Sequence, residues 1–397
     1  MLTIDNVYRA RNALKGVARK TDVIFAPKFS GDAQVYLKTE NLQVTGSFKV
    51  RGAYYKMMKL SDEEKAKGVV ACSAGNHAQG VALAAQKSGI KAVICLPDGA
   101  PISKVEATKS YGAEVCLVEG VYDDAYQKAL SLRDEMGYTF LHPFDDEDVV
   151  AGQGTIALEL VEQLPDLDAV IVPIGGGGLI SGIAFTIKTL YPNIKVYGVQ
   201  AAGAPSMANA IADGKIEALP SVSTIADGIA VKKPGSLTYD ICQKYVDEIV
   251  TVTDDEISAA ILALMENQKL VTEGAGAVPV AAVMFNKLNI KGKKVVCVLS
   301  GGNIDVTILS RVINRGLLMS GRSCKFTIEL VDKPGQLKDV SRIIAEHGGN
   351  VTSVRHERAN EGADVNGCYL SVALETRNFE HIAEIKNALC DFGFKLL

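Results

Sequence analysis

The feature that most constrains the fold is an alternation of short, wholly apolar segments with segments of helical periodicity, which begins near residue 67. The apolar segments have the length of strands, and the segments between them repeat apolar residues at helical spacing. Strands that are apolar on both faces and separated by helices are typical of parallel sheets covered by helices on both sides. We therefore expect an α/β protein, with strands at "GVVAC", "KAVICLP", "EVCLV", "DAVIVPI", "KVYGVQA" and "KKVVCVLS".

The order of these segments predicts a body of two lobes over residues 1–318. The smaller lobe spans about residues 45–145, and the larger lobe combines residues 1–44 with residues 146–318. A chain of 397 residues exceeds the usual size of a single hydrophobic core, so more than one domain is expected.

The pattern changes after this body. From residue 325 onward the segments follow the order strand–helix–strand–strand–helix–strand, with the third strand over residues 366–375. This order is typical of the ferredoxin-like fold. We therefore predict a linker at residues 319–324 and a separate α+β domain over residues 325–397.

Composition excludes several classes of function. The net charge of −4 provides no basic surface for nucleic acid and no cationic helix for a membrane. No apolar run is long enough to span a bilayer, and no charged-then-apolar leader begins the chain. The eight cysteines are scattered, and several lie in apolar strands, which indicates buried thiols in a reducing compartment. We therefore expect a cytoplasmic protein whose partners include neither nucleic acid nor a membrane.

Scarce histidine narrows the chemistry further. Only His77 and His142 precede residue 323, so a multi-histidine zinc site is not expected in the body. A Ser-His-Asp triad also lacks support, because the sequence Gly-x-Ser-x-Gly does not occur. We predict no metal site.

Lys49 stands at the start of an apolar helical pattern in "TGSFKVRGAYYKMMK". The first turn of a helix is an unfavourable place for a cation, because the helix N-terminus is itself positive. For a single lysine, a solvated surface position remains the ordinary interpretation. The alternative is a lysine kept unprotonated so that it can form a Schiff base with a carbonyl cofactor.

A run of four glycines follows the strand "DAVIVPI" and precedes a helix. Exposed backbone N–H groups at a helix N-terminus can bind a phosphate without basic side chains. A dinucleotide fold is the rival, but the spacing differs from Gly-x-Gly-x-x-Gly, and the next strand reaches Gln200 where an acidic residue would hold a ribose. Because glycine costs conformational entropy, a purely structural turn would not need four of them.

Two more loops follow predicted strands. Residues 73–77, "SAGNH", lead into a helix, where open N–H groups suit a carboxylate and an Asn amide can donate to a phenolate oxygen. An ordinary helix N-cap is an equal alternative for this segment. Residues 300–303, "SGGN", end the strand "KKVVCVLS". All three loops would lie at the carboxyl ends of parallel strands, where open α/β sheets bind ligands.

These segments together resemble a known family. In this order, "SFKVRGA", "SAGNHAQG", the four glycines, "EGAGA" and "LSGGN" resemble the fold-type II pyridoxal-phosphate enzymes, and within them the threonine dehydratase (threonine ammonia-lyase) branch. The resemblance covers about residues 1–320. The C-terminal segment resembles an ACT domain, with "LVDKPGQL" as its first strand and loop.

The resemblance implies roles for individual residues. Lys49 forms the Schiff base with pyridoxal 5'-phosphate, Phe48 lies against the cofactor ring and Asn76 bonds the ring's 3-hydroxyl oxygen. Glu273 lies near the reactive side of the cofactor, and Ser300 binds the pyridine nitrogen. The residues expected at the phosphate are Gly175, Gly176, Gly177, Gly178 and Leu179. Those expected to hold the substrate carboxylate are Ser73, Ala74, Gly75, Asn76 and His77.

The implied reaction is β-elimination of L-threonine to 2-oxobutanoate and ammonia, and of L-serine to pyruvate. The freed amine of Lys49 removes the α-proton while the cofactor ring accepts the electron pair. A neutral Ser300 moderates carbanion stabilisation, which suits prompt loss of the β-hydroxyl. Serine racemases, by contrast, carry a serine at the position of Ala74 and carboxylates for a divalent metal just after the strand that ends at Gln200, where this chain has "QAAGAPS".

The ACT resemblance implies pairing between subunits and allosteric control by a small ligand, most simply an aliphatic amino acid such as isoleucine or valine. The ligand is expected near Gly335, Gln336, Leu337 and Asn350, where free N–H groups at a helix start suit a carboxylate. A module for dimerisation alone is the alternative, and a homodimer or homotetramer is expected in either case.

Other functions stay open at this point. Within the enzymes, a serine-preferring dehydratase or another β-eliminating or β-replacing pyridoxal enzyme, such as a cysteine synthase, fits the same motifs. A non-enzymatic amino-acid sensor is not favoured, because a lapsed catalytic body has no need of Lys49.

Overall fold

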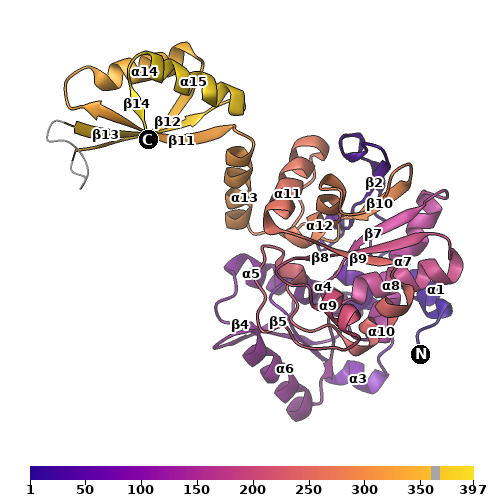
Figure 1. Ribbon diagram of the computed structural model, residues 1–397. Coiled ribbons are helices and arrows are strands. Elements are labelled where there is room, and N and C mark those ends of the chain that lie inside the picture. The colour runs from indigo at the N-terminus through magenta and orange to yellow at the C-terminus, as the bar shows by residue number, and fades with distance from the viewer. Residues whose placement is uncertain (359–366) are drawn as a thin grey trace. The chain divides into compact units, whose positions relative to one another are not determined.

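The computed structural model describes residues 1–358 and 367–397, which form two compact units, Met1–Ile308 and Leu309–Leu397 (Figure 1). Helix α13, Val306–Met319, contains the point at which the two units divide. The predicted division at residues 318 and 325 stays a prediction. Among the described residues, no helix is both long and apolar enough to cross a bilayer.

The larger lobe of the first unit is built on a six-stranded sheet with the order β1-β2-β10-β7-β8-β9. All neighbouring strands are parallel except β1 and β2, which are antiparallel. The predicted parallel α/β sheet is therefore confirmed. The strands are β1 (Val23–Phe25), β2 (Gln34–Lys38), β7 (Ala169–Pro173), β8 (Lys195–Ala201), β9 (Glu248–Val252) and β10 (Lys294–Val298).

Both faces of this sheet are buried, as its wholly apolar strands predict. Val170 and Val172 of β7 belong to a core with helices α7 and α8, while Ile171 between them is equally buried on the opposite face, where α12 packs. The helices of this lobe are α1 (Ile4–Ala13), α7 (Glu147–Gln163), α8 (Gly178–Leu190), α9 (Ser206–Asp213), α10 (Ser236–Tyr245), α11 (Asp254–Gln268) and α12 (Gly274–Met284), with short 3₁₀ turns η1 (Pro27–Phe29), η2 (Glu40–Leu42) and η3 (Asp227–Ile229).

The smaller lobe has a four-stranded parallel sheet with the order β5-β4-β3-β6. Val69 and Ala71 of β3 belong to a core with helices α2 and α4, whereas Val70 and Cys72 face a second core beneath α6. The strands are β3 (Val69–Cys72), β4 (Ala92–Pro97), β5 (Glu114–Val118) and β6 (Thr139–Phe140), and the helices are α2 (Lys49–Met58), α3 (Asp62–Lys67), α4 (Asn76–Ser88), α5 (Ile102–Ser110) and α6 (Tyr122–Met136).

Helix α2, which begins at Lys49, crosses α7 of the larger lobe at very short range. A Cβ added to Gly152 of α7 would lie 2.6 Å from the Cα of Gly52. Only glycine on both helices permits this approach. It fixes the start of α2 against the larger lobe.

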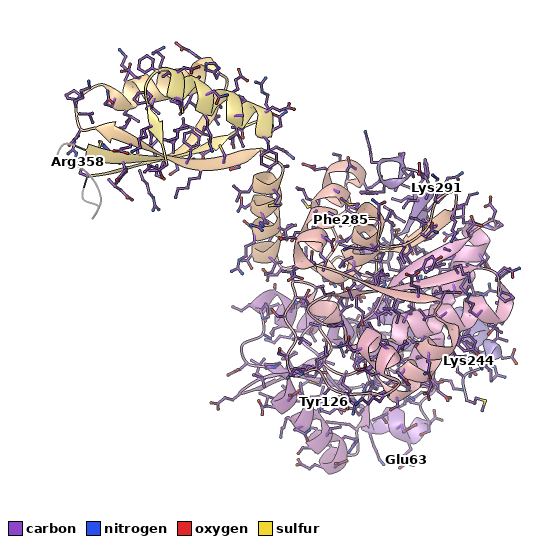
Figure 2. The ribbon with its side chains drawn as sticks, viewed as in Figure 1. Glu63, Tyr126, Lys244, Phe285, Lys291 and Arg358 are labelled. Carbon is purple, nitrogen blue, oxygen red and sulfur yellow. The ribbon has the colours of Figure 1, made fainter. Side chains whose placement is uncertain are left out.

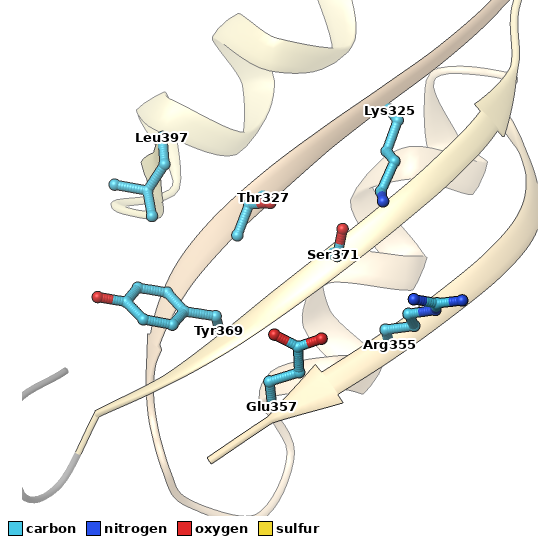
Figure 3. Close-up of a pocket in the computed structure, with 7 residues that line it drawn as sticks. All are labelled: Lys325, Thr327, Arg355, Glu357, Tyr369, Ser371 and Leu397. Atoms are coloured by element: carbon cyan, nitrogen blue, oxygen red, sulfur yellow. The ribbon is translucent and has the colours of Figure 1, made fainter. Parts of the chain in front are cut away.

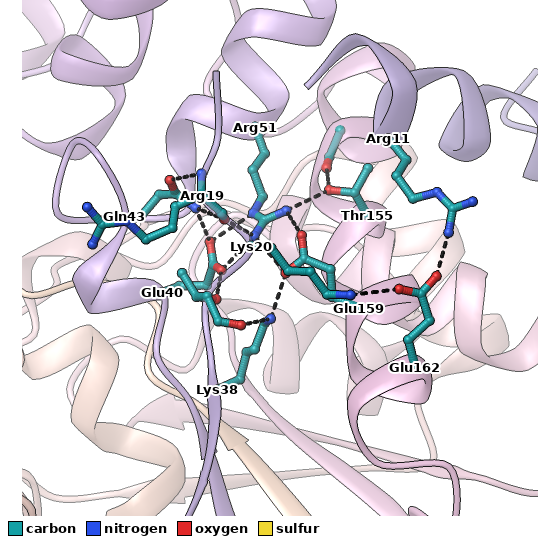
Figure 4. Close-up of polar contacts among 12 residues, drawn as sticks. Arg11, Arg19, Lys20, Lys38, Glu40, Gln43, Arg51, Thr155, Glu159 and Glu162 are labelled. Carbon is teal, nitrogen blue, oxygen red and sulfur yellow. Dashed lines mark hydrogen bonds and ion pairs between the residues drawn. The ribbon is translucent and has the colours of Figure 1, made fainter. Parts of the chain in front are cut away.

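A buried network of charges anchors the same helix (Figure 4). The Arg51 guanidinium donates to both oxygens of Glu40, at 2.8 and 2.9 Å, and to both oxygens of Glu159, at 2.6 and 3.0 Å. Lys38 donates to Glu159 over 2.6 Å. Two cations thus balance two carboxylates. Although burial disfavours its charge, the neighbouring Arg51 guanidinium lowers the pKa of the Glu40 carboxyl.

The second unit contains an antiparallel sheet with the order β12-β13-β11-β14, as the ferredoxin-like prediction requires. Alternate residues of β11 and β13, such as Ile328 and Leu370, form a core with both helices, so the helices cover one face of the sheet. The strands are β11 (Ser323–Val331), β12 (Asn350–Glu357), β13 (Gly367–Glu375) and β14 (Lys395–Leu396), and the helices are α14 (Gln336–Glu346) and α15 (Phe379–Asp391). Residue 366, where the sequence starts the third strand, lies outside the described residues.

Candidate active site

Two of the three predicted loops, those after β3 and β10, meet beside the start of α2. The glycine loop after β7 is linked to Lys49 through Pro143 and Phe144. The N–H of Phe48 donates to the carbonyl of Ser300 over 3.1 Å, so the loop after β10 is joined to the residue before Lys49. A Cβ at Gly301 of that loop would lie 2.4 Å from Glu273 and 3.1 Å from Asn76. The carboxyl ends of β3 and β10 therefore supply one continuous site, although the two strands belong to different sheets.

Lys49 is the first residue of α2 and is half-buried. Its Nζ donates to the carbonyl of Pro143 over 2.8 Å and lies 5.2 Å from the centre of the Phe48 ring. Desolvation lowers the pKa of the Lys49 amine to about 8, against the opposing attraction of the Glu273 charge. Near neutral pH part of this amine is unprotonated and able to attack a carbonyl.

A chain of side-chain hydrogen bonds crosses the site from Asn303 to Glu273. Asn303 Nδ2 donates to Asn76 Oδ1 over 2.8 Å, and Asn76 Nδ2 donates to Glu273 Oε1 over 2.7 Å. The first bond fixes which side of the Asn76 amide presents its NH₂ group. Burial and the charge of Asp227 raise the pKa of Glu273 to about 7. Glu273 therefore holds a proton for part of the time near neutral pH.

The tetraglycine loop leads into α8, whose first-turn N–H groups have no intrahelical partner. Its backbone is packed closely: a Cβ at Gly176 would lie 2.4 Å from the Phe144 ring, and one at Gly178 would lie 2.9 Å from the Phe144 Cα. Gly177 has φ +97°, which disfavours any side chain. Thr238 Oγ1 donates to the Gly176 carbonyl over 2.6 Å and fixes the turn.

The remaining phosphate candidates flank this turn. A Cβ at Gly175 would lie 3.0 Å from the Cα of Ile229, and Leu179 is buried in the first turn of α8. Ser300 is buried as well, beside the start of α2.

Apart from the Asn76 amide, the segment Ser73–His77 offers mainly its backbone to the site. Ser73 Oγ accepts the N–H of Gly75 over 3.1 Å, and nothing lies within 4 Å of a Cβ built on Gly75. Ala74 is half-buried. The His77 ring is buried and bonds the carbonyl of Leu141 through Nε2 over 2.9 Å, and desolvation lowers the pKa of His77 to about 3. The ring is thus neutral near neutral pH, and the predicted contact of His77 with a substrate carboxylate would use its backbone N–H at the start of α4.

Comparison with known proteins decides the family. The family of pyridoxal-phosphate dependent enzymes matches residues 14–301, and the ACT domain matches residues 326–391. The chain belongs to the pyridoxal-phosphate dependent enzymes. The predicted cofactor, pyridoxal 5'-phosphate, is confirmed with the family.

Three similar proteins illustrate the relationship. The L-threonine ammonia-lyase of Thermotoga maritima is 49% identical over 100% of this chain and 99% of its own. The processed form of threonine deaminase isoform 2 from Solanum lycopersicum has a TM-score of 0.75 and 39% identity over 79% of this chain and 88% of its own. Maize serine racemase has a TM-score of 0.75 and 35% identity over 80% of this chain and 98% of its own.

The site has donors that a pyridoxal-phosphate dependent enzyme requires. The N–H groups at the start of α8 can bind a phosphate, and close packing against Phe144 and Thr238 holds the glycine loop that presents them. Lys49 would form the Schiff base with the cofactor, and the amide of Asn76 would bond a ring oxygen. The individual roles of the predicted site residues stay predictions.

No sequence motif pointed to the segment that joins the glycine loop to Lys49. The Pro143 carbonyl accepts a hydrogen bond from the Lys49 amine, and Phe144 packs against Gly176 and Gly178. His142 Nδ1 accepts the N–H of Asp145 over 2.8 Å and shapes this turn. The turn follows the short strand β6, and the only signal in the sequence was the single histidine in "LHPFDD".

The predicted effector residues lie in the second unit, at the start of α14 and of β12. Gly335 is the N-cap of α14 with φ +99°, Gln336 and Leu337 form its first turn, and Asn350 begins β12 and donates to Glu375 over 2.8 Å. A pocket of about 490 Å³ lies elsewhere, on the sheet face away from the helices (Figure 3). It is lined by Lys325, Thr327, Arg355, Glu357, Tyr369, Ser371 and Leu397.

Proposed function

We propose that this protein is a pyridoxal-phosphate dependent lyase that converts L-threonine into 2-oxobutanoate and ammonia, and L-serine into pyruvate and ammonia. The observation that carries the proposal is the Lys49 amine, with its pKa lowered to about 8, at the point where the loops after β3 and β10 meet. Similarity to an L-threonine ammonia-lyase over the whole chain supports the choice of substrate.

The residues of the chain account for the steps around the substrate. When bound, the cofactor supplies an electron-accepting system for the electron pair released at the substrate Cα. Lys49 takes the Cα proton, because an amine with a lowered pKa is partly unprotonated at neutral pH. The N–H groups at the start of α4 hold the substrate carboxylate. Ala74 has no proton to give, which favours elimination over racemisation.

The overall reaction needs no oxidant or reductant. The Cβ–oxygen bond of threonine breaks with loss of water, and the released enamine takes up water at Cα and loses ammonia. One water molecule is lost and one is taken up, so the overall reaction converts threonine into 2-oxobutanoate and ammonia.

Replacing Lys49 by alanine tests the catalytic assignment. We expect the variant to fold but to lose threonine turnover and the absorbance of the Schiff base, measured by 2-oxobutanoate release and visible spectroscopy. Lys59→Ala, at the exposed end of the same helix, is the control and should keep both. Full turnover by purified Lys49→Ala would show that another group takes the proton.

Regulation by an amino acid through the ACT domain is part of the same proposal. We expect a chain that ends after Leu318 to turn over threonine but to lose its response to isoleucine or valine, because regulation requires a ligand that binds two states unequally. Leu337→Ala tests the site at the start of α14, and Arg355→Ala tests the pocket on the open face of the sheet. A truncated enzyme that still responds to the same effector would contradict this assignment.

A cytoplasmic location and a homodimer or homotetramer complete the proposal. All eight cysteines are free thiols, which fits a reducing compartment. Light scattering of the purified holoenzyme tests the assembly.

A further inference from the structure

The second unit brings three metal-ligating side chains together at one end of its sheet. Asp332 follows β11, His356 lies near the end of β12 and Cys368 lies near the start of β13. One ligand atom from each residue lies within 4.8 Å of the other two. The three strands are neighbours in the order β12-β13-β11.

The register of the strands explains this convergence. His356 pairs with Leu370, and Cys368 pairs with Leu330, so these four residues project from the same face of the sheet. Leu330 and Leu370 belong to the core beneath the helices. Asp332 lies two positions beyond Leu330. The three ligands therefore lie on the helix-covered face of the sheet, at the edge of that core.

One side of the cluster is buried in the core, and the other side is open to solvent. Cys368 is 1% exposed and packs within the core, whereas Asp332 and His356 are exposed. A metal bound there would be held by the Cys368 sulfur, whose position is fixed by core packing. The metal would enter from solvent past the Asp332 carboxylate and the His356 imidazole.

We propose that Asp332, His356 and Cys368 form a zinc site in the C-terminal unit. Thiolate, imidazole and carboxylate are the three protein ligands that zinc uses, and three of them leave a fourth tetrahedral position for water. Magnesium and calcium take oxygen ligands and are disfavoured by a sulfur and a nitrogen donor. Binding releases the thiol proton of Cys368, and the metal replaces it.

One cation competes for the cluster. Arg358 Nε lies 3.0 Å from Asp332 Oδ2, and Figure 2 shows Arg358 at the end of β12. Its side chain is 70% exposed, so this ion pair is weak and can be displaced by a divalent ion. Removal of the guanidinium should therefore strengthen metal binding.

Equilibrium dialysis of the full-length holoenzyme against zinc chloride, with metal content measured by atomic emission, tests the site. We expect one zinc ion per chain above the content of His356→Gln and Asp332→Asn, whose exposed positions tolerate substitution. Cys368→Ser should lose the same ion. Cys390→Ser and His347→Gln, in the same unit, are the controls and should keep it.

The arginine provides a test that misfolding cannot mimic. Arg358→Gln should bind zinc about two- to fivefold more tightly, because it removes an exposed ion pair and a like charge. Excess magnesium should not displace the ion. Equal zinc content in the wild type, His356→Gln and Asp332→Asn would overturn the proposal, as would displacement by magnesium.

Discussion

Replacing the buried Arg51 by methionine should destabilise the protein far more than the same replacement of Arg11, which lies on the surface. The Arg51 side chain is 2% exposed, and its partners Glu40 and Glu159 are 0% and 10% exposed. Methionine keeps much of the packing volume but leaves two carboxylates with Lys38 as their remaining cation. Removing one partner of a buried ion pair costs about 3–5 kcal/mol, because an uncompensated charge stays away from water.

Arg11 provides a matched control (Figure 4). Arg11 Nη1 lies 2.6 Å from Glu162 Oε1, the same distance as Arg51 Nη1 from Glu159 Oε1. The Arg11–Glu162 pair is 40% and 46% exposed, so solvent screens it and Arg11→Met should cost less than about 1 kcal/mol. Urea unfolding followed by circular dichroism gives both free energies.

The pH dependence separates charge from packing. In the wild type the pKa of Glu40 is lowered by Arg51, so its stabilising contribution is present above the ordinary pKa and lost as pH falls through the lower folded value. Without Arg51, burial dominates and Glu40 takes up a proton as pH falls. The loss of folding free energy caused by Arg51→Met should therefore decrease as pH falls from about 8 to about 5. Equal costs for the two methionine variants, or a cost that is constant with pH, would refute this reasoning.

Three further changes probe the site. Gly176→Ala should raise the dissociation constant of pyridoxal 5'-phosphate, because its Cβ would lie 2.4 Å from a phenyl ring, whereas Gly99→Ala, with nothing within 4 Å, should not; titration of the cofactor-free protein measures both. Asn303→Ala should lower threonine turnover about tenfold without unfolding the protein, since the Asn76 amide loses the bond that orients it; unchanged turnover would remove Asn303 from the site. Glu273 has a pKa raised from 4.5 to about 7, so its own contribution to the stability of the cofactor-free protein should fall by about 3 kcal/mol as pH rises through this window. The difference in stability between the wild type and Glu273→Gln should change by that amount across the window, and a difference that is constant with pH would contradict it.

Much of the fold could be predicted because burial leaves a local mark on the sequence. Val69 to Cys72 are all apolar since alternate residues face two different cores, and this pattern requires a sheet covered on both sides. The position of Lys49 at a helix start, and the glycine run after β7, were also local signals. The turn at Pro143 and Phe144 was missed because its contacts with Lys49 and the glycine loop join residues far apart in the chain.

The sequence by itself determined the α/β body, the ferredoxin-like C-terminal order, the family and its cofactor, because periodicity and short motifs depend on neighbours along the chain. The tertiary structure decided which distant groups meet. It placed Arg51 between Glu40 and Glu159, and it aligned Asn303 with Asn76. It also brought Asp332, His356 and Cys368 within 4.8 Å, where no sequence motif had predicted a metal site. Strand register and helix packing decide which distant residues come into contact. Both depend on how the whole hydrophobic core packs, and no single segment of the sequence fixes them.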